Sequence, residues 1–171
     1  DGDGYGNELN GFEGDVCPDI SGTSIHDRLG CLDSDGDGFS NPDSNYNSEN
    51  GADAFPQEPT QWRDSDGDGF GDNWANPEWT ANRESQNPVI GEYVLNAKLV
   101  DACPLLPGVA AEDLDGCVDT DGDGWSDDND VFPLQPSQWN DRDGDGWGDN
   151  TSAEAHMPDA MPDEPTQWSD Q

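Results

Sequence analysis

The chain has 171 residues and a formal net charge of −35, because 40 acidic residues stand against only 5 lysines and arginines. This charge excludes nucleic acid as a partner, since phosphate binding needs a basic surface. Hydrophobic residues make up 30% of the chain, against about 45–50% in a typical globular protein, which excludes a large apolar core. The chain still contains 7 Trp, 5 Phe and 3 Tyr, so we expect a folded state that depends on a cation. No apolar run approaches the ~18–20 residues of a membrane span.

A pattern of nine residues, Asp-x-Asp-Gly-Asp-Gly-aromatic-x-Asp/Asn, recurs along the chain, and such repetition has to be interpreted before any other feature. Residues 1–7 form the first copy, which lacks its first Asp. We call the copies loops 1 to 5 and count positions from the first Asp of the pattern, so that Asp1 occupies position 3 of loop 1. The complete copies, loops 2 to 5, begin at Asp33, Asp64, Asp119 and Asp141.

Each loop is followed, at a variable distance, by Asp-x-Cys/Phe/Met-Pro. After Phe or Met the chain continues as Pro-x-x-Pro-Thr/Ser-Gln-Trp, which we call the Gln-Trp connector; its tryptophans are Trp62, Trp139 and Trp168. After Cys it continues through a longer segment that ends in a second Cys, which we call the disulfide connector. The aspartates that open these motifs, which we call the closing aspartates, are Asp15, Asp53, Asp101, Asp130 and Asp159.

The spacing of the loop aspartates is typical of calcium binding. Calcium takes six to eight oxygen ligands, which loops of this kind supply from positions 1, 3, 5, 7 (backbone carbonyl), 9 and 12. Glycine at position 6 allows the sharp turn. Loop 4 fits this scheme without gaps, with its closing Asp130 at position 12. In the other loops the closing aspartates are assigned by motif, and Asp43 is a rival to Asp53 in loop 2.

The sequence therefore predicts a protein that binds about five or more calcium ions. The predicted ligands are, loop by loop, Asp1, Asp3, Tyr5, Asn7 and Asp15; Asp33, Asp35, Asp37, Phe39, Asn41 and Asp53; Asp64, Asp66, Asp68, Phe70, Asp72 and Asp101; Asp119, Asp121, Asp123, Trp125, Asp127 and Asp130; and Asp141, Asp143, Asp145, Trp147, Asp149 and Asp159.

Position 7 is aromatic in every loop, although a carbonyl ligand does not require an aromatic side chain. We expect these rings to pack on the Gln-Trp or Phe-Pro segments, and a sugar-binding aromatic face is the alternative.

The four cysteines lie in two pairs of identical spacing, Cys17/Cys31 and Cys103/Cys117. Neither pair has zinc-site spacing, so two local disulfides are predicted, each worth ~3 kcal/mol for a loop of this length. Disulfides indicate an extracellular or cell-surface location.

We expect a mostly irregular fold with little regular secondary structure, built from tandem calcium-wrapped loops stapled by the disulfides. The least acidic stretch, residues 74–100, interrupts the repeats and predicts a short hairpin or helix. Three parts follow: repeats in 1–73 with the Cys17–Cys31 loop, the insertion 74–100, and repeats in 101–171 with the Cys103–Cys117 loop.

Catalysis is not expected. His26 and His156 are isolated and are predicted to be surface residues, and the chain has no nucleophile motif or phosphate loop. Aspartates that hold calcium are ionised and occupied, so they are unsuited to acid–base work. Asn150-Thr151-Ser152 forms a glycosylation sequon, which has meaning only in a host that glycosylates.

The loops and closing motifs resemble the thrombospondin type 3 repeat, Asp-x-Asp-x-Asp-Gly-x-x-Asp-x-x-Asp-x-Cys-Pro. Residues 119–133 match it position by position, except that Phe132 replaces Cys. The resemblance implies a calcium-wrapped structure in secreted matrix or adhesive proteins, and the variants with Phe-Pro and Gln-Trp segments are similar to those of large microbial surface proteins. EF-hand sensors and dockerins share the first nine loop positions, but they need flanking helices, and here Pro and Gly flank the loops.

The predicted function is structural: a calcium-dependent extracellular repeat that forms one period of a head-to-tail filament, stalk or matrix fibre. Residues 167–171 match the internal Gln-Trp-x-Asp-x segments, and residues 1–6 supply the sequence that follows these segments elsewhere. Joined head to tail, Asp170 becomes position 1 of loop 1 in the next copy, so copies of the chain are the expected partner. The alternative is a calcium-binding spacer or adhesin module within a larger secreted protein. A calcium sensor would expose an apolar groove, and no amphipathic stretch could form one.

Overall fold

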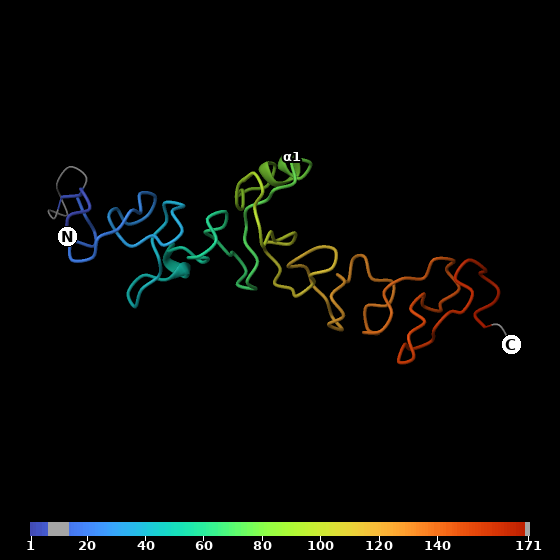
Figure 1. Cartoon of the computed structure of the whole chain (residues 1–171). Helices are drawn as coiled ribbons and strands as arrows, with labels where there is room; N and C mark the ends of the chain where they lie inside the picture. The colour runs from blue at the N-terminus through green and yellow to red at the C-terminus, as the bar shows by residue number, and fades with distance from the viewer. Residues whose placement is uncertain (7–13, 170–171) are drawn as a thin grey trace. The chain divides into compact units, whose positions relative to one another are not determined.

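Turns and isolated bridges, rather than helices and sheets, make up the fold (Figure 1). The computed structural model describes residues 1–6 and 14–169. Within that range the regular elements are the 3-10 helix η1, Ser48–Asn50, and the α-helix α1, Thr80–Glu84. The prediction of a mostly irregular fold is confirmed. The isolated β-bridges are all parallel and join Gly6 to Gly14, Gly71 to Val100, Trp74 to Tyr93 and Gly148 to Pro158.

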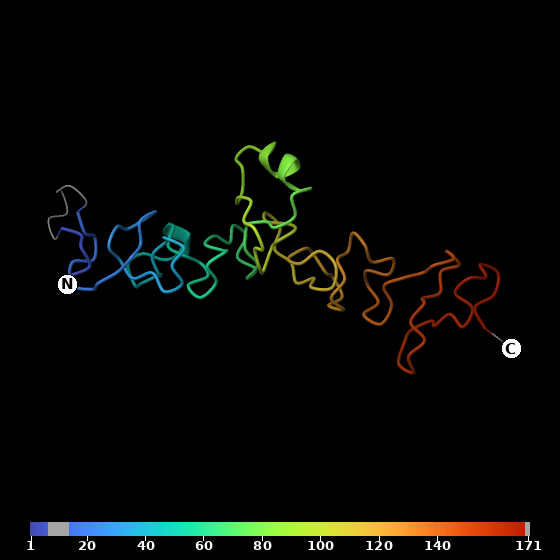
Figure 2. The same ribbon diagram turned by 45° about the horizontal axis from the view of Figure 1, so that its top comes forward.

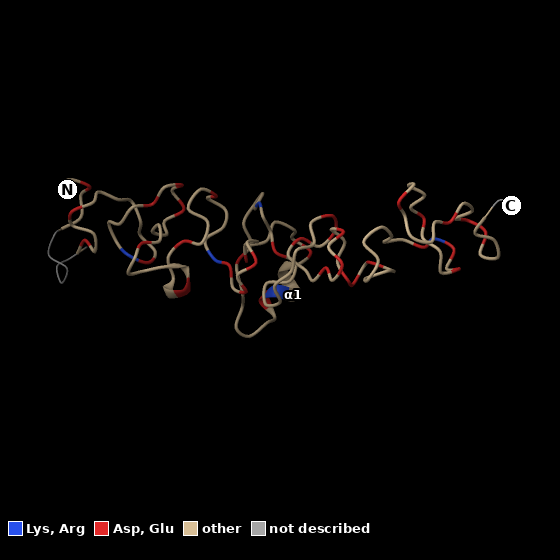
Figure 3. Cartoon of the chain, turned by 90° about the horizontal axis from the view of Figure 1, so that it is seen from below, with Lys and Arg blue, Asp and Glu red and all other residues tan. Residues whose placement is uncertain are grey.

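The chain divides into two compact units, Asp1–Pro104 and Leu105–Gln171. Acidic residues are spread along both units, whereas lysines and arginines are few (Figure 3). Both predicted disulfides are confirmed: Cys17 and Cys31 are joined with their Cα atoms 5.0 Å apart, and Cys103 is bonded to Cys117. Among the helices of the described residues, none has the length and apolarity that crossing a membrane requires.

The insertion 74–100 belongs to the first unit and carries α1 (Figures 1 and 2). The chain leaves loop 3, forms α1 and returns beside its own outgoing segment, as the bridges Trp74–Tyr93 and Gly71–Val100 record. Trp74 is 1% exposed and its indole N–H donates to the Thr80 hydroxyl at 3.0 Å. The insertion therefore contains the helix that the sequence offered as one of two possibilities, held against the base of loop 3 by a buried tryptophan.

The interior of the described residues is mostly polar. Only Cys31, Ala52, Trp74, Ala110 and Cys117 are buried hydrophobic residues there. Fixing the backbone of one residue costs about 1–2 kcal/mol, and burial of so few apolar side chains does not offset that cost over the whole chain. Polar contacts and disulfides therefore contribute a large share of the stabilisation. After Trp74, the largest fully buried side chains are polar or acidic: those of Gln61, Gln138, Asn73, Asp15, Asp53, Asp72, Asp101 and Asp159.

Candidate metal centres

The loop turns are formed by hydrogen bonds from backbone amides to aspartate side chains, and loop 4 shows the arrangement. Asp119, at position 1, accepts from the amides of Gly122 and Gly124 at 2.7 and 2.8 Å. These glycines have φ values of 82° and 101°, in the left-handed region that residues with a Cβ atom disfavour. Asp123, at position 5, accepts from the amide of Trp125 at 2.9 Å. The alternation of Asp and Gly thus folds the loop so that its carboxylates lie on the inside.

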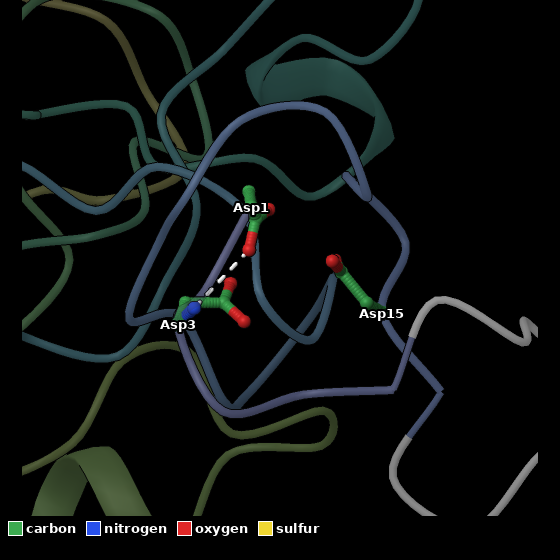
Figure 4. A group of neighbouring side chains, drawn as sticks. All are labelled: Asp1, Asp3 and Asp15. Atoms are coloured by element: carbon green, nitrogen blue, oxygen red, sulfur yellow. Dashed lines mark hydrogen bonds between the residues drawn. The ribbon is translucent and has the colours of Figure 1, made fainter.

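Each loop brings three carboxylates together. In every group, one oxygen from each member lies within 4.8 Å of the others. Figure 4 shows loop 1, in which the closing Asp15 approaches Asp1 and Asp3 and completes the group that the absent position 1 leaves short. Loops 2 to 5 assemble their groups from positions 1, 3 and 5, namely Asp33, Asp35 and Asp37; Asp64, Asp66 and Asp68; Asp119, Asp121 and Asp123; and Asp141, Asp143 and Asp145.

The closing aspartates return to the same point of their loops whatever the length of the intervening segment. In loop 4, the amide of Asp130 donates to the carbonyl of Ser126 at position 8, with a distance of 2.8 Å. In loop 3 the chain first runs through the insertion, yet the amide of Asp101 donates to the position-8 carbonyl of Gly71 at 2.9 Å. The remaining closing amides make the same bond: Asp15 to Gly6 at 2.8 Å, Asp53 to Ser40 at 2.9 Å and Asp159 to Gly148 at 2.8 Å.

The Oδ1 atom of each closing aspartate accepts a hydrogen bond from the backbone amide two residues further on. The Oδ1 atom of Asp53 accepts from the amide of Phe55 at 2.7 Å, and the residue is 0% exposed. Its Oδ2 atom is buried without a hydrogen-bond partner, a costly condition for a carboxylate unless a cation binds there. Among the residues that the structure describes, the other aspartates whose buried Oδ2 has no hydrogen-bond partner include Asp15, Asp101 and Asp159, and Asp35, Asp37, Asp121, Asp123, Asp143 and Asp145 at positions 3 and 5.

The electrostatics of loop 2 connect its closing aspartate to the rest of the group. The pKa of Asp53 is raised to about 7, chiefly by burial and in part by the negative charges of Asp37, Asp35 and Asp33. Burial likewise raises the pKa of Asp37 to about 6, assisted by the neighbouring aspartates. The ion-free loop therefore favours protonation, because ionised carboxylates repel one another inside it. A divalent cation would remove that repulsion.

Loops 3 and 4 have the same coupling. Burial raises the pKa of Asp101 to about 7, and Asp68 and Asp66 of loop 3 contribute by their charge. Burial also raises the pKa of Asp130, and Asp123 and Asp121 of loop 4 contribute. The closing aspartates of loops 2, 3 and 4 are thus electrostatically part of the loops to which the sequence motif assigned them.

The rival in loop 2 has a different environment. Asp43 forms an ion pair with Arg28, and its side chain is 45% exposed. The hydrogen bond from Arg28 lowers the pKa of Asp43, the opposite of the shift at Asp53. Asp43 therefore has a resident cationic partner, whereas Asp53 faces the carboxylates of loop 2.

The predicted ligands at position 9 make a contact that the sequence did not predict. Both oxygens of Asp127 accept hydrogen bonds from Thr120 at position 2, at 2.7 Å from the amide and 2.6 Å from the hydroxyl. Asp72 is held in the same way by Ser65. Position 9 thus closes the base of the loop, and water would have to connect it to an ion. Asn41 and Asp149 likewise accept hydrogen bonds from the position-2 amides of Ser34 and Arg142. The predicted ligands Asn7 and Asp170 lie outside the described residues.

The prediction that the position-7 rings pack on connectors is confirmed in three loops. Each ring stacks on the tryptophan of the Gln-Trp connector that follows its loop. The centroid distances and interplanar angles are 5.3 Å and 11° for Phe39 and Trp62, 6.2 Å and 5° for Trp125 and Trp139, and 5.3 Å and 2° for Trp147 and Trp168. In loop 2 His26 adds a third ring, 5.1 Å from Phe39, while remaining on the surface as predicted. His156 is exposed as well.

The glutamine of the Gln-Trp connector is a structural residue that sequence reasoning missed. Gln138 is 1% exposed; its amide group donates to the carbonyls of Asn150 and His156, both at 2.9 Å, and its Oε1 accepts from the amide of Asn150 at 3.0 Å. Gln61 makes the equivalent bonds to Asn73 and Lys98 around loop 3. We call this arrangement the glutamine clamp. Its sequence signal was the recurrence of Gln before Trp in each connector.

The clamp also accounts for the sequon asparagine. The side-chain amide of Asn150 donates to the carbonyl of Ser137 at 2.8 Å, and its Oδ1 accepts from the amide of Ser152 at 3.1 Å. The nitrogen that a glycan would modify is therefore engaged in the fold.

The donor sets fit calcium. They consist of carboxylate oxygens, without His or Cys in any of the groups, which suits a hard cation and disfavours zinc or copper. Their turn-rich loops also suit calcium, which accepts irregular coordination, better than magnesium, which demands a strict octahedron. When bound, the ion would supply the positive charge that the buried, unpaired Oδ2 atoms lack.

No protein-family model matches the chain, and a search of curated proteins finds no match either. The resemblance to thrombospondin type 3 repeats therefore remains a prediction that rests on the residues quoted above.

Proposed function

We propose that the chain is a calcium-dependent structural repeat whose five loops each bind calcium. One observation carries the proposal: the closing aspartates of loops 1, 2, 3 and 5 are buried with one carboxylate oxygen unpaired, beside groups of loop carboxylates. A buried anion without a partner is stable only when it is protonated or bound to a cation. At neutral pH and in calcium, the second state applies.

Calcium binding is coupled to folding. Five ions would add ten positive charges to the formal charge of −35 and bring it to about −25. Since few apolar side chains are buried, much of the binding free energy becomes folding free energy. The affinity per site is expected to be on the order of 10⁻⁴–10⁻³ M, as in other extracellular calcium modules.

The setting proposed is extracellular. Both pairs of cysteines form disulfides and the described chain has no free cysteine, which favours an oxidising compartment. In that setting the chain acts as a rigid scaffold rather than an enzyme, because the aspartates of its loops hold ions. A spacer or adhesin module in a larger secreted protein would use the same property.

Head-to-tail joining of copies into a filament, stalk or fibre is the larger assembly that we propose. The support is the match in sequence: residues 167–171 repeat the internal Gln-Trp-x-Asp-x segments, and residues 1–6 match the sequence that follows those segments elsewhere. Electron microscopy of native material tests the assembly: a regular fibre is expected, and monodisperse particles would contradict it.

Calcium titration of the chelated chain tests the proposal itself. We expect the near-UV circular dichroism of the stacked tryptophans to appear between micromolar and millimolar calcium, and equal magnesium to produce much less signal. Asp121→Ala, which removes a central carboxylate of loop 4, should lower the number of bound ions by one. A near-UV spectrum and protease resistance that EDTA leaves unchanged would refute the proposal.

A further inference from the structure

Two loops of the same type differ in one contact. Loops 3 and 5 both follow a Gln-Trp connector, both carry glycine at position 8 and both are held by a glutamine clamp. Their closures are also alike: the amides of Gly71 and Gly148 donate to the carbonyls of Leu99 and Met157, two residues before the closing aspartates. Loop 3 alone has a buried arginine at this point.

Arg83 of α1 provides that contact. It is 4% exposed, and its guanidinium donates to two backbone carbonyls: Nη1 to Asp72, at position 9, over 3.4 Å, and Nη2 to Asp101, the closing aspartate. The guanidinium carbon lies 5.6 Å from the ring centroids of both Trp74 and Trp79, a favourable place for a cation. The guanidinium of Arg83 thus connects position 9 of loop 3 to its closing aspartate.

The closure of loop 3 has an entropic disadvantage. Asp101 follows Gly71 by 30 residues, whereas Asp159 follows Gly148 by 11. Closure of the longer segment is roughly fivefold less favourable in its equilibrium, by the logarithmic dependence of loop-closure entropy on length. Without further help, loop 3 would open more readily than loop 5 when calcium is withdrawn.

We propose that Arg83 is a resident cation of loop 3, which keeps this loop closed when calcium is absent. The proposal rests on the proposed calcium site in loop 3 and assigns Arg83 as a positioning residue for that site. Arg28 makes one of these two contacts at loop 2: its Nη2 donates to the position-9 carbonyl of Asn41 at 2.7 Å, and its guanidinium carbon lies 4.4 Å from the centroid of the Tyr46 ring. Residues 101–140, which contain loop 4, have no lysine or arginine.

Amide hydrogen exchange, resolved by residue, tests the proposal on the full chain in EDTA and in saturating calcium. In EDTA, we expect the amides of Gly71 and Asp101 to exchange more slowly than those of Gly148 and Asp159. Arg83→Gln should accelerate loop 3 exchange in EDTA by about tenfold to a hundredfold, the loss expected for buried charged hydrogen bonds, and so reverse the order of the two loops. In calcium the acceleration should fall to about twofold or less, because the ion supplies the charge.

Arg63→Gln is the matched control, since Arg63 precedes loop 3 but is exposed; it should leave the exchange of loop 3 unchanged. Arg83→Lys, which keeps the charge but cannot span both carbonyls, should give an intermediate acceleration. Equal acceleration by Arg83→Gln with and without calcium would assign the residue a packing role and overturn the proposal, as would no acceleration in EDTA. Failure of calcium to protect loops 4 and 5 would instead refute the proposed function.

Discussion

The chain joins one loop to the next in two ways, and residues 17–31 and 55–64 show the contrast. In the first, a disulfide closes the connector, and its Asp27 accepts from the amide and hydroxyl of Ser40 at position 8 of the following loop. In the second, a tryptophan stacks on the preceding loop and Gln61 is buried against the following one. Before either connector begins, the amide of the closing aspartate donates to the position-8 carbonyl of the preceding loop.

The residue type at position 8 of a loop depends on which kind of connector precedes that loop. Serine occupies it after the disulfide connectors, at Ser40 and Ser126, where it binds Asp27 and Asp113. Glycine occupies it after the Gln-Trp connectors, at Gly71 and Gly148, where a Cβ atom would overlap the glutamine side chain. The loop therefore has the same structure after either connector. A disulfide connector and a Gln-Trp connector are alternative ways to hold it in place.

Reduction of the disulfides should produce the largest difference in stability between the two kinds of connector. In calcium, reducing both disulfides should cost ~3 kcal/mol for each, by the loss of chain restraint. Amide exchange should then rise in residues 17–31 and 103–117 and stay low in residues 55–64 and 132–141. Faster exchange throughout the chain would show that the Gln-Trp connectors depend on the disulfides.

Substitution of two glycines, Gly22 in a connector and Gly148 in loop 5, should have the next largest effect. In Gly22→Ala the new Cβ would overlap the backbone carbonyl of Cys31, whereas in Gly148→Ala it would meet the end of the Gln138 side chain. Backbone cannot move aside as a side chain can, so we expect about 3 kcal/mol for the first and about 1–2 kcal/mol for the second. Thermal unfolding in calcium measures both, and the reverse order would contradict this account of the packing.

Loss of the clamp should cost somewhat less than the Gly22 substitution. Gln138→Ala leaves the amide of Asn150 and the carbonyls of Asn150 and His156 without partners, and we expect about 2 kcal/mol. Gln57→Ala, at an exposed glutamine of a connector of the same type, is the control and should change stability little. Similar melting temperatures for the two variants would mean that water replaces the clamp.

A separate test concerns pH in the absence of calcium. The pKa values of Asp53 and Asp101 are raised to about 7 in the fold, so the folded chain binds more protons than the unfolded chain between about pH 4 and 7. The calcium-free fold should therefore gain stability as pH falls from 8 to 5, and lose it as pH rises through 7. Calcium affinity should change in the opposite direction, because protons compete for the same oxygens. A chelated chain that melts lower at pH 5 than at pH 8 would contradict the assignment.

Much of the fold followed from local patterns. The Asp-Gly alternation, the cysteine spacing and the aromatic position 7 are short-range signals, and the structure confirms the irregular fold, the disulfides and three of the ring stacks. The contacts that sequence reasoning missed are long-range. Gln61 reaches Lys98, and Arg83 reaches Asp101, through the path of the insertion, which no periodicity describes.

Position 9 illustrates a different limit. The loop pattern assigned Asp127 to the ion, but its spacing from Thr120 also suits a hydrogen bond across the loop base. A carboxylate can bind an ion or accept these hydrogen bonds, and only the three-dimensional structure of the loop shows the hydrogen bonds.

Native mass spectrometry of the folded chain in millimolar calcium tests the central claim most directly, because it counts the bound ions. Five loops, each with a group of three neighbouring carboxylates, predict five calcium ions per chain. Asp53→Asn should reduce the count to four, whereas Asp43→Asn, at the exposed partner of Arg28, should leave it at five. Absence of bound calcium, or loss of an ion from Asp43→Asn and not from Asp53→Asn, would contradict the account.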